Sequence, residues 1–278
     1  MNEQVLCLGS QANLLAIWTP PEGEPRPVAM VLLNAGVIHR IGAHRINVKL
    51  ARRLAADGYG CLRFDLGGVG DSPTERGAAD YRVQAVRDII AVLDAVQARF
   101  GVAAFALVGI CSGAAHAQAA ALVDRRIRGV FLIDGYMHPT WRGRAHFASR
   151  MVQAYGWRAT AARVVRHLAG RARRAATGDP AHAADGLQRS RAEFAADMQQ
   201  LVGDGVQVVL MFTGSVLELY AYPAQLRHGF AGQPWVDRVR CLFEPGVDHT
   251  LTLRESQRLL VEHVRAWLPH VAPAGSDR

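Results

Sequence analysis

The pentapeptide Gly109-Ile110-Cys111-Ser112-Gly113 joins two segments of different character. Residues 104–108 are a strand-like apolar run, and residues 114–123 are an alanine-rich segment that is typical of a helix. Strand, glycine-flanked turn and helix are the layout of a nucleophile elbow, whose middle residue occupies the tip of a sharp turn. The pattern therefore predicts that Cys111 points into a cleft above a helix N-terminus, where free N–H groups stabilise a thiolate or an oxyanion.

Two alternatives to a reactive Cys111 remain open at this point. An inert thiol in a tight turn would also fit, because cysteine is among the most buried residue types. Ser112 would be the nucleophile if the motif were shifted by one residue, but the glycine spacing would then be lost. The central position favours Cys111, and a neighbouring histidine would lower the pKa of its thiol.

The composition describes a large folded chain that lacks obvious disulfides. Its 278 residues are half hydrophobic, enough for one large α/β domain with an insertion. Cys7, Cys61 and Cys241 lie in strand-like runs, which indicates buried thiols in a reducing compartment.

The first residues resemble no signal peptide, so a cytoplasmic location is expected. Residues 101–123 carry little charge, but a buried strand and helix explain them better than a membrane span.

Strand-like and helical patterns alternate on both sides of the elbow. Helical patterns cover residues 43–56, 80–99 and 253–268. Strand-like runs cover residues 5–8, 14–19, 28–33, 59–65, 104–108, 129–133, 206–212 and 239–243. After an initial hairpin, this alternation predicts an α/β fold with a mostly parallel, doubly wound sheet of about eight strands. Residues 1–135 and 204–268 would form this core.

Residues 136–203 interrupt the alternation, because they have helical patterning and no clear strand. They are predicted to form an inserted helical lid. Eleven arginines fall between Arg142 and Arg191, so an acidic partner would bind there. The polar tail at 269–278 is expected to be disordered.

Three features follow one another along the chain: the elbow, an acid after a later strand, and Asp248-His249-Thr250 after the last strand. This order resembles the α/β-hydrolase superfamily, here with Cys in place of Ser at the elbow. The resemblance implies the α/β-hydrolase fold and a triad with Cys111 as nucleophile and His249 as base. It implies Glu218, after the strand at 206–212, as the acid, with Asp134 after the preceding strand as the alternative.

The resemblance also places an oxyanion loop after the strand at 28–33, where this chain has Asn34-Ala35-Gly36-Val37. The expected donors are the backbone amides of Ser112 and Val37, with Gly36 as the alternative to Val37. Gly36, His39 and Arg40 are candidates for substrate contact, although an ordinary polar loop is the simpler explanation of His39 and Arg40. The glycine turn at 65–70 is interpreted as structural, because no helix N-terminus follows closely enough to bind a phosphate.

These residues predict an acyl-transfer enzyme that forms a covalent Cys111 acyl-enzyme: an ester hydrolase, a thioesterase, an acyltransferase or a cyclase. A thioester intermediate can be captured by an amine, alcohol or thiol as well as by water. The arginine-rich segment suggests an acyl donor bound to CoA or to a carrier protein, and no metal, cofactor or nucleic acid is expected. The alternative is a non-catalytic ligand-binding or interaction protein on the same fold. The acyl group, the acceptor and the oligomeric state are left open.

Overall fold

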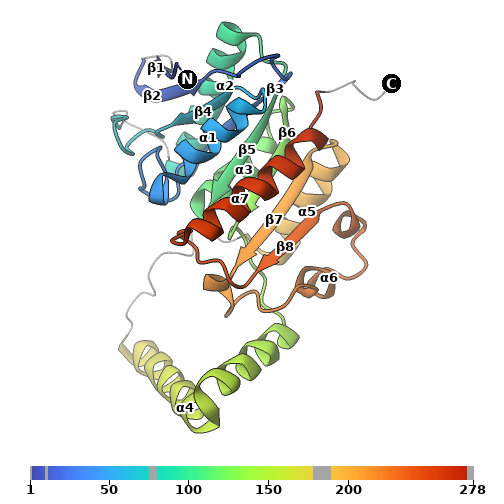
Figure 1. Cartoon of the computed structure of the whole chain (residues 1–278). Helices are drawn as coiled ribbons and strands as arrows, with labels where there is room; N and C mark the ends of the chain where they lie inside the picture. The colour runs from blue at the N-terminus through green and yellow to red at the C-terminus, as the bar shows by residue number, and fades with distance from the viewer. Residues whose placement is uncertain (1, 10–11, 75–79, 178–188, 274–278) are drawn as a thin grey trace.

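A computed structural model describes residues 2–9, 12–74, 80–177 and 189–273 of the chain (Figure 1). Its strands form one eight-stranded sheet in the order β1-β2-β4-β3-β5-β6-β7-β8. The strands are β1 (Gln4–Leu8), β2 (Leu14–Thr19), β3 (Val28–Leu32), β4 (Cys61–Phe64), β5 (Ala104–Ile110), β6 (Ile127–Ile133), β7 (Gln207–Thr213) and β8 (Arg240–Glu244). The pairs β1–β2 and β2–β4 are antiparallel, and the other pairs are parallel. The predicted α/β fold and its mostly parallel sheet are confirmed.

Helices cover both faces of the sheet, as Figure 1 shows. On one face, α1 (Ile46–Ala56) and α7 (Arg254–Trp267) contribute to one buried cluster. On the other face, α2 (Tyr81–Phe100), α3 (Ser112–Ala121) and α5 (Arg191–Gly203) contribute to a second. Asp80 accepts a hydrogen bond from the Arg82 amide at the start of α2, and Gly101 ends that helix with φ 65°.

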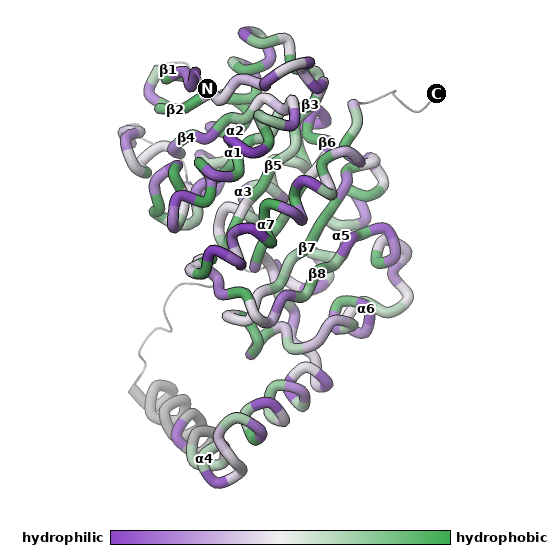
Figure 2. The backbone as a smooth tube through the Cα atoms, in the orientation of Figure 1, coloured by the Kyte–Doolittle hydropathy of each residue, from purple (hydrophilic) through white to green (hydrophobic). Residues whose placement is uncertain are grey.

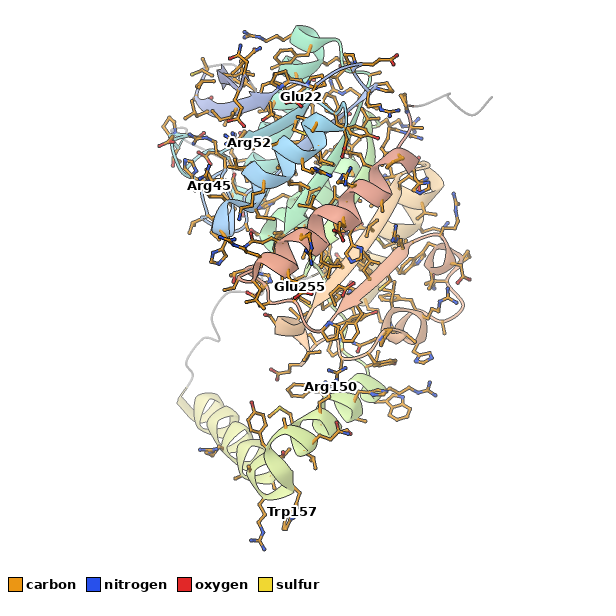
Figure 3. All side chains as sticks on the ribbon, viewed as in Figure 1. Glu22, Arg45, Arg52, Arg150, Trp157 and Glu255 are labelled. Carbon is orange, nitrogen blue, oxygen red and sulfur yellow. The ribbon has the colours of Figure 1, made fainter. Side chains whose placement is uncertain are left out.

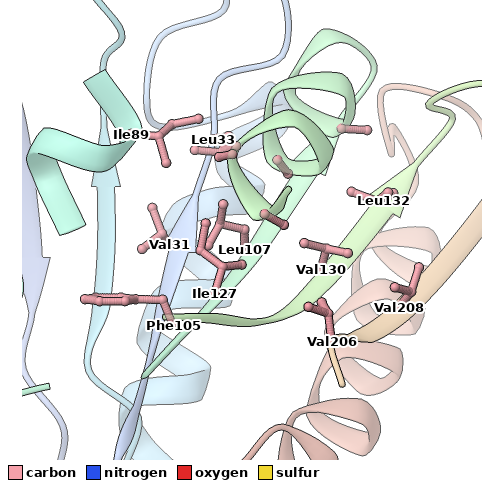
Figure 4. Close-up of a cluster of buried hydrophobic side chains, with 14 of the residues drawn as sticks. Val31, Leu33, Ile89, Phe105, Leu107, Ile127, Val130, Leu132, Val206 and Val208 are labelled. Atoms are coloured by element: carbon pink, nitrogen blue, oxygen red, sulfur yellow. The ribbon is translucent and has the colours of Figure 1, made fainter. Parts of the chain in front are cut away.

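The central strands are buried on both faces, which requires nearly continuous apolar sequence. Val31, Leu107 and Val130 point toward the α2–α3 face, where Figure 4 shows them packed together. Met30 and Phe131, each next to one of these residues, belong to the cluster on the opposite face. This two-sided core fixes the carboxyl edge of the sheet, from which the loops carrying Cys111, Asp134 and His249 emerge.

The segment 136–203, expected to be a lid, divides into two parts with different packing. Helix α4 (Trp141–Thr177) is interrupted at Gly156, which has φ 78° and ψ 159°, and it projects away from the sheet (Figure 1). Helix α5 instead buries Phe194, Met198 and Leu201 in the core. The expected boundary at 203–204 is therefore wrong for α5, because its apolar face completes the layer over β7.

Two smaller expectations also differ from the structure. Cys7 is exposed on the edge strand β1, whereas Cys61 is buried and Cys241 is partly buried. Val271 is buried against the core, so the tail packs at least to that residue, and residues 274–278 lie outside the described part. Residues 101–123 form β5 and α3, and within the described ranges no helix combines the length and hydropathy needed to cross a membrane.

Candidate active site

Cys111 lies at the tip of the turn between β5 and α3, with φ 58° and ψ −120°. Backbone in this region is rare for a residue with a side chain, and the surrounding structure must hold it there. The flanking glycines allow the turn to close. A Cβ on Gly109 would lie 2.2 Å from the Gly113 carbonyl oxygen, and one on Gly113 would lie 2.4 Å from the Asn34 carbonyl oxygen. The thiol is exposed.

Asp134 and His249 meet beside this turn, although 115 residues separate them. The Asp134 carboxylate accepts a hydrogen bond from His249 Nδ1 at 2.8 Å. The backbone N–H and hydroxyl of Thr213 donate to the same carboxylate at 2.8 and 2.6 Å. The His249 backbone N–H donates to Ser215 Oγ at 2.8 Å, which fixes the loop after β8. These contacts orient the imidazole and leave Nε2 for another partner.

The electrostatics couple Cys111 to His249. A hydrogen bond with His249 lowers the pKa of the Cys111 thiol, and the Ser112 amide adds to this effect, while burial and the Asp134 charge oppose it. Hydrogen bonds to Asp134 and then to Cys111 raise the pKa of His249 to about 10. A lowered thiol pKa beside a raised imidazole pKa favours the thiolate–imidazolium pair.

Glu218, the acid preferred from the sequence, does not join this group. It is exposed in the loop that follows β7 and the 3-10 turn Gly214–Val216, while the carboxylate on His249 is that of Asp134. Asp134 was the alternative. Its strand β6 pairs with the elbow strand β5 through Ile133 and Ile110, so its carboxylate starts next to Cys111. Asp248 instead accepts hydrogen bonds from Thr250 and Thr252.

The loop after β3 brings its amides close to the elbow. Gly36 N–H donates to Ser112 Oγ at 2.7 Å, a contact that sequence reasoning missed because it joins residues 76 apart. The Val37 amide has no hydrogen-bond acceptor among the described residues, and the Val37 side chain is exposed. The Ser112 amide faces the Cys111 sulfur. Val37 and Cys111 line the same pocket, and the Val37 amide is therefore free of acceptors among the described residues at a position beside the elbow.

A mostly apolar pocket of 300 Å³ opens beside Cys111. It lies between the loop after β3, the start of α1 and the His249 loop. Its lining residues are Leu33, Ala35, Gly36, Val37, Ile38, Gly42, Ala43, Ile46, Asn47, Ile110, Cys111, His249 and Thr250. Of the predicted contact residues, Gly36 is in this lining, whereas His39 and Arg40 are not.

Arg40 and His39 instead hold the loop in place. The Arg40 guanidinium donates to the carboxylates of Asp65 and Asp71, and His39 Nε2 lies 3.1 Å from Asp71. Asn34 Nδ2 donates to Asp65 Oδ1 at 3.1 Å, which ties the network to the end of β3. His39, Asp65 and Asp71 offer ligand atoms within 4.8 Å of one another. A metal ion there would meet the Arg40 charge, so the group fits a structural ion-pair network better than a metal site.

Comparison with known proteins identifies the family to which the chain belongs. A family model described as alpha/beta hydrolase fold matches residues 31–201, more than half of the chain. Among curated protein sequences, none matches the chain significantly.

Solved structures resemble nearly the whole chain at low identity. A serine hydrolase homologue from Coxiella burnetii is 17% identical with a TM-score of 0.57, covering 95% of this chain and 97% of that one. The esterase domain of a Rhodothermus marinus protein is 17% identical with a TM-score of 0.54, covering 96% of each chain. An epoxide hydrolase from Vigna radiata is 15% identical with a TM-score of 0.55, covering 96% and 98%. At these identities the likeness shows a shared fold.

Proposed function

Because the chain belongs to the alpha/beta hydrolase fold family, we propose that it is an acyl-transfer enzyme acting on esters or thioesters through a covalent Cys111 acyl-enzyme. One observation supports this function best. His249 Nδ1 donates to the Asp134 carboxylate at 2.8 Å, and the same imidazole lowers the pKa of the Cys111 thiol at the carboxyl edge of the sheet. Nucleophile, base and orienting acid in this relation are what nucleophilic acyl transfer requires.

The proposed reaction begins with proton transfer from the Cys111 thiol to His249 Nε2. The thiolate then attacks the substrate carbonyl carbon, and the amides of Ser112 and Val37 donate to the oxygen on which negative charge develops. When the tetrahedral intermediate collapses, the bond to the alcohol or thiol leaving group breaks, and His249 gives that group its proton. A thioester between Cys111 and the acyl group remains.

The second half of the reaction releases the acyl group. His249 takes a proton from water, an alcohol, an amine or a thiol, which attacks the thioester carbonyl, and the proton returns to the Cys111 sulfur as it leaves. Water gives hydrolysis, an external acceptor gives acyl transfer, and a nucleophile within the acyl chain gives cyclisation. The apolar 300 Å³ pocket beside Cys111 favours a small hydrophobic acyl group.

In this proposal Asp134 takes the role first given to Glu218. Its carboxylate holds Nδ1 of His249, which keeps the imidazole in the tautomer whose Nε2 can accept the thiol proton. The buried hydrogen bonds from Thr213 keep the carboxylate in position. Thr213 is therefore a positioning residue.

A donor bound to CoA or to a carrier protein is a second candidate for the substrate. The observation that favours it is the arginine-rich α4, which would attract phosphate or carboxylate groups. A non-catalytic ligand-binding protein is the alternative function, since a fold does not determine an activity.

Intact-mass spectrometry after incubation with a panel of acyl thioesters and aryl esters tests the proposal. We expect an acyl adduct on the wild type and on Cys7→Ala, which removes an exposed thiol elsewhere, and none on Cys111→Ala. The mass of the adduct identifies the acyl group. Equal labelling of Cys111→Ala would mean non-specific acylation. If the wild type showed no adduct and no turnover with any member of the panel, that result would favour the ligand-binding alternative.

A further inference from the structure

Helix α4 concentrates the positive charge of the whole protein. Between Trp141 and Thr177 there are nine arginines and no aspartate or glutamate. The formal net charge of the chain is +8, so the rest of the protein is close to neutral. An ordinary solvated helix mixes both signs, because neighbouring opposite charges stabilise it and like charges repel. Such a concentration of one sign of charge attracts anionic partners.

An apolar stripe accompanies the charge. Residues 141, 145, 148, 152 and 155 follow one another at spacings of four and three, and they are Trp, Ala, Ala, Val and Tyr. The pattern resumes after Gly156 with Trp, Ala, Val and Leu at positions 157, 161, 164 and 168. Such spacing places Trp141, Val152 and Tyr155 on one face of the first half of the helix. Figure 2 shows apolar and polar residues alternating along the first half of α4.

Most of this surface is uncovered in the structure. Trp141 is 75% exposed and Trp157 is 67% exposed. The Arg142 and Arg158 guanidinium groups each lie 5.3 Å from the ring of the tryptophan that precedes them. Large exposed aromatic side chains next to cations indicate a binding surface rather than a solvated face.

Two ring contacts join the first turns of α4 to the body of the protein. His146 stacks on Tyr222 at 4.5 Å, and the Arg150 guanidinium lies 5.9 Å from the Phe243 ring. Residues 152–159 are all exposed. Figure 3 shows Arg150 near the body and Trp157 at the far end of the projection. A flat, extended partner can therefore reach the length of the helix without displacing the core.

We propose that α4 docks the protein on an anionic membrane surface. Arginines on the polar face and tryptophans on the apolar face are the composition of a helix that lies in the lipid headgroup region. Anionic headgroups would balance the arginines, and tryptophan rings are stable at this depth. An acidic carrier or a CoA molecule would account for the charge but not for two tryptophans 16 positions apart on apolar stripes.

Docking would also bring the candidate active site close to the membrane surface. Helix α4 begins shortly after Asp134 and at the same edge of the sheet as Cys111, so the bound protein would hold its pocket close to the lipid surface. Acyl donors dissolved in the membrane would then be the accessible substrates. This last step rests on the proposed function, whereas the docking itself does not.

Co-sedimentation of the full chain with vesicles tests the docking. The vesicles are phosphatidylcholine alone, or phosphatidylcholine with roughly one-third phosphatidylglycerol. We expect binding at least about tenfold stronger to the anionic vesicles, weakening when salt is raised to about 0.5 M. The Cys111→Ala variant should bind equally well, so this result is independent of acyl transfer. Failure of the wild type to prefer anionic vesicles would overturn the proposal.

Two matched sets of variants separate α4 from net charge. One set replaces four exposed arginines of α4 by glutamine, and vesicle affinity should fall at least about 100-fold. The control set replaces four exposed arginines elsewhere, with the same change of net charge and little expected loss. The first set is Arg142, Arg150, Arg158 and Arg166, and the control set is Arg53, Arg238, Arg254 and Arg258. Equal loss in both sets would overturn the role of α4.

The tryptophans separate lipid from other polyanions. Replacing Trp141 and Trp157 by alanine should lower vesicle affinity at least about tenfold, because two apolar side chains no longer enter the headgroup region. The same variant should bind heparin, a polyanion without an apolar phase, as the wild type does. Replacing the exposed Val123 and Leu253 by alanine is the control. Unchanged vesicle binding of the tryptophan variant would overturn the lipid assignment in favour of an acidic carrier or CoA.

Discussion

Charged groups are buried and hydrogen-bonded at the carboxyl edge of the sheet, whereas along helix α4 they are exposed to solvent. At the sheet edge, Asp134 is buried and accepts hydrogen bonds from two groups of Thr213 and from His249. Along α4, Arg142, Arg150 and Arg158 are exposed, and the helix contains no acidic residue. Fixed dipoles around a reacting group lower a barrier because they need no reorganisation. The first region is therefore built for chemistry, and the second is built to meet a charged surface.

The largest expected effect lies in the orienting acid. Asp134→Asn should lower kcat on the order of 10⁴-fold with the fold intact, because the amide cannot hold His249 in the reactive tautomer. Glu218→Gln, at the exposed carboxylate first expected to be the acid, should leave kcat within about twofold. Steady-state kinetics on an aryl ester, with circular dichroism to check folding, makes the comparison. A large loss in Glu218→Gln would contradict the assignment.

Two glycines test how tightly each region is built. Gly113→Ala should lower the free energy of unfolding by about 3 kcal/mol, because its Cβ would lie 2.4 Å from the Asn34 carbonyl oxygen. Gly156→Ala should leave that free energy nearly unchanged. A Cβ added at Gly156 would have no atom within 4 Å. The backbone strain at its positive φ would affect only helix α4, which projects away from the core. Urea denaturation of both variants provides the measurement, and equal losses would contradict the difference in packing.

Thr213 gives a smaller effect on catalysis. Thr213→Val removes the hydroxyl that donates to Asp134 at 2.6 Å and keeps the backbone donor. We expect kcat to fall roughly 30-fold, which is the size of one lost hydrogen bond to a charged group. Thr252→Val, which loses hydroxyl contacts with Asp248 and Thr250 and none with Asp134, is the matched control. If the two variants have the same kcat, the hydroxyl of Thr213 does not position the carboxylate.

The sequence predicted the sheet, the elbow and the histidine because these depend on local patterns. Apolar runs and glycine spacing are properties of neighbouring residues, and Cys111 follows from them. The choice between Asp134 and Glu218 depends on which loop turns its side chain toward His249, a long-range property. Thr213 holds the Asp134 carboxylate with two hydrogen bonds. No local sequence pattern connects Thr213 with residue 134, so the sequence could not identify Asp134 as the acid.

The expectation of a lid does not apply to α5, for a related reason. Helix α5 has a capping box at Ser190 and Glu193, a local signal that predicts a helix start. Whether this helix covers a substrate or the sheet depends on which residues Phe194 and Met198 pack against. Those packing contacts are long-range and cannot be derived from the local sequence. Helix α4 differs because its composition alone, with arginines and no acidic residue, indicates that the body of the protein does not cover it.

The smallest effect concerns the titration of the nucleophile. Hydrogen bonding with His249 lowers the pKa of Cys111, so the pH midpoint for iodoacetamide labelling of Cys111 should lie below that of an ordinary thiol. Below this midpoint Cys111 is protonated and reacts slowly with iodoacetamide, and above it the labelling rate should stay constant.

The rate of substrate turnover should fall again near pH 10, where His249 loses the proton that it gives to the leaving group. His249→Asn should raise the labelling midpoint of Cys111, and equal midpoints in the wild type and in His249→Asn would mean that no thiolate–imidazolium pair exists.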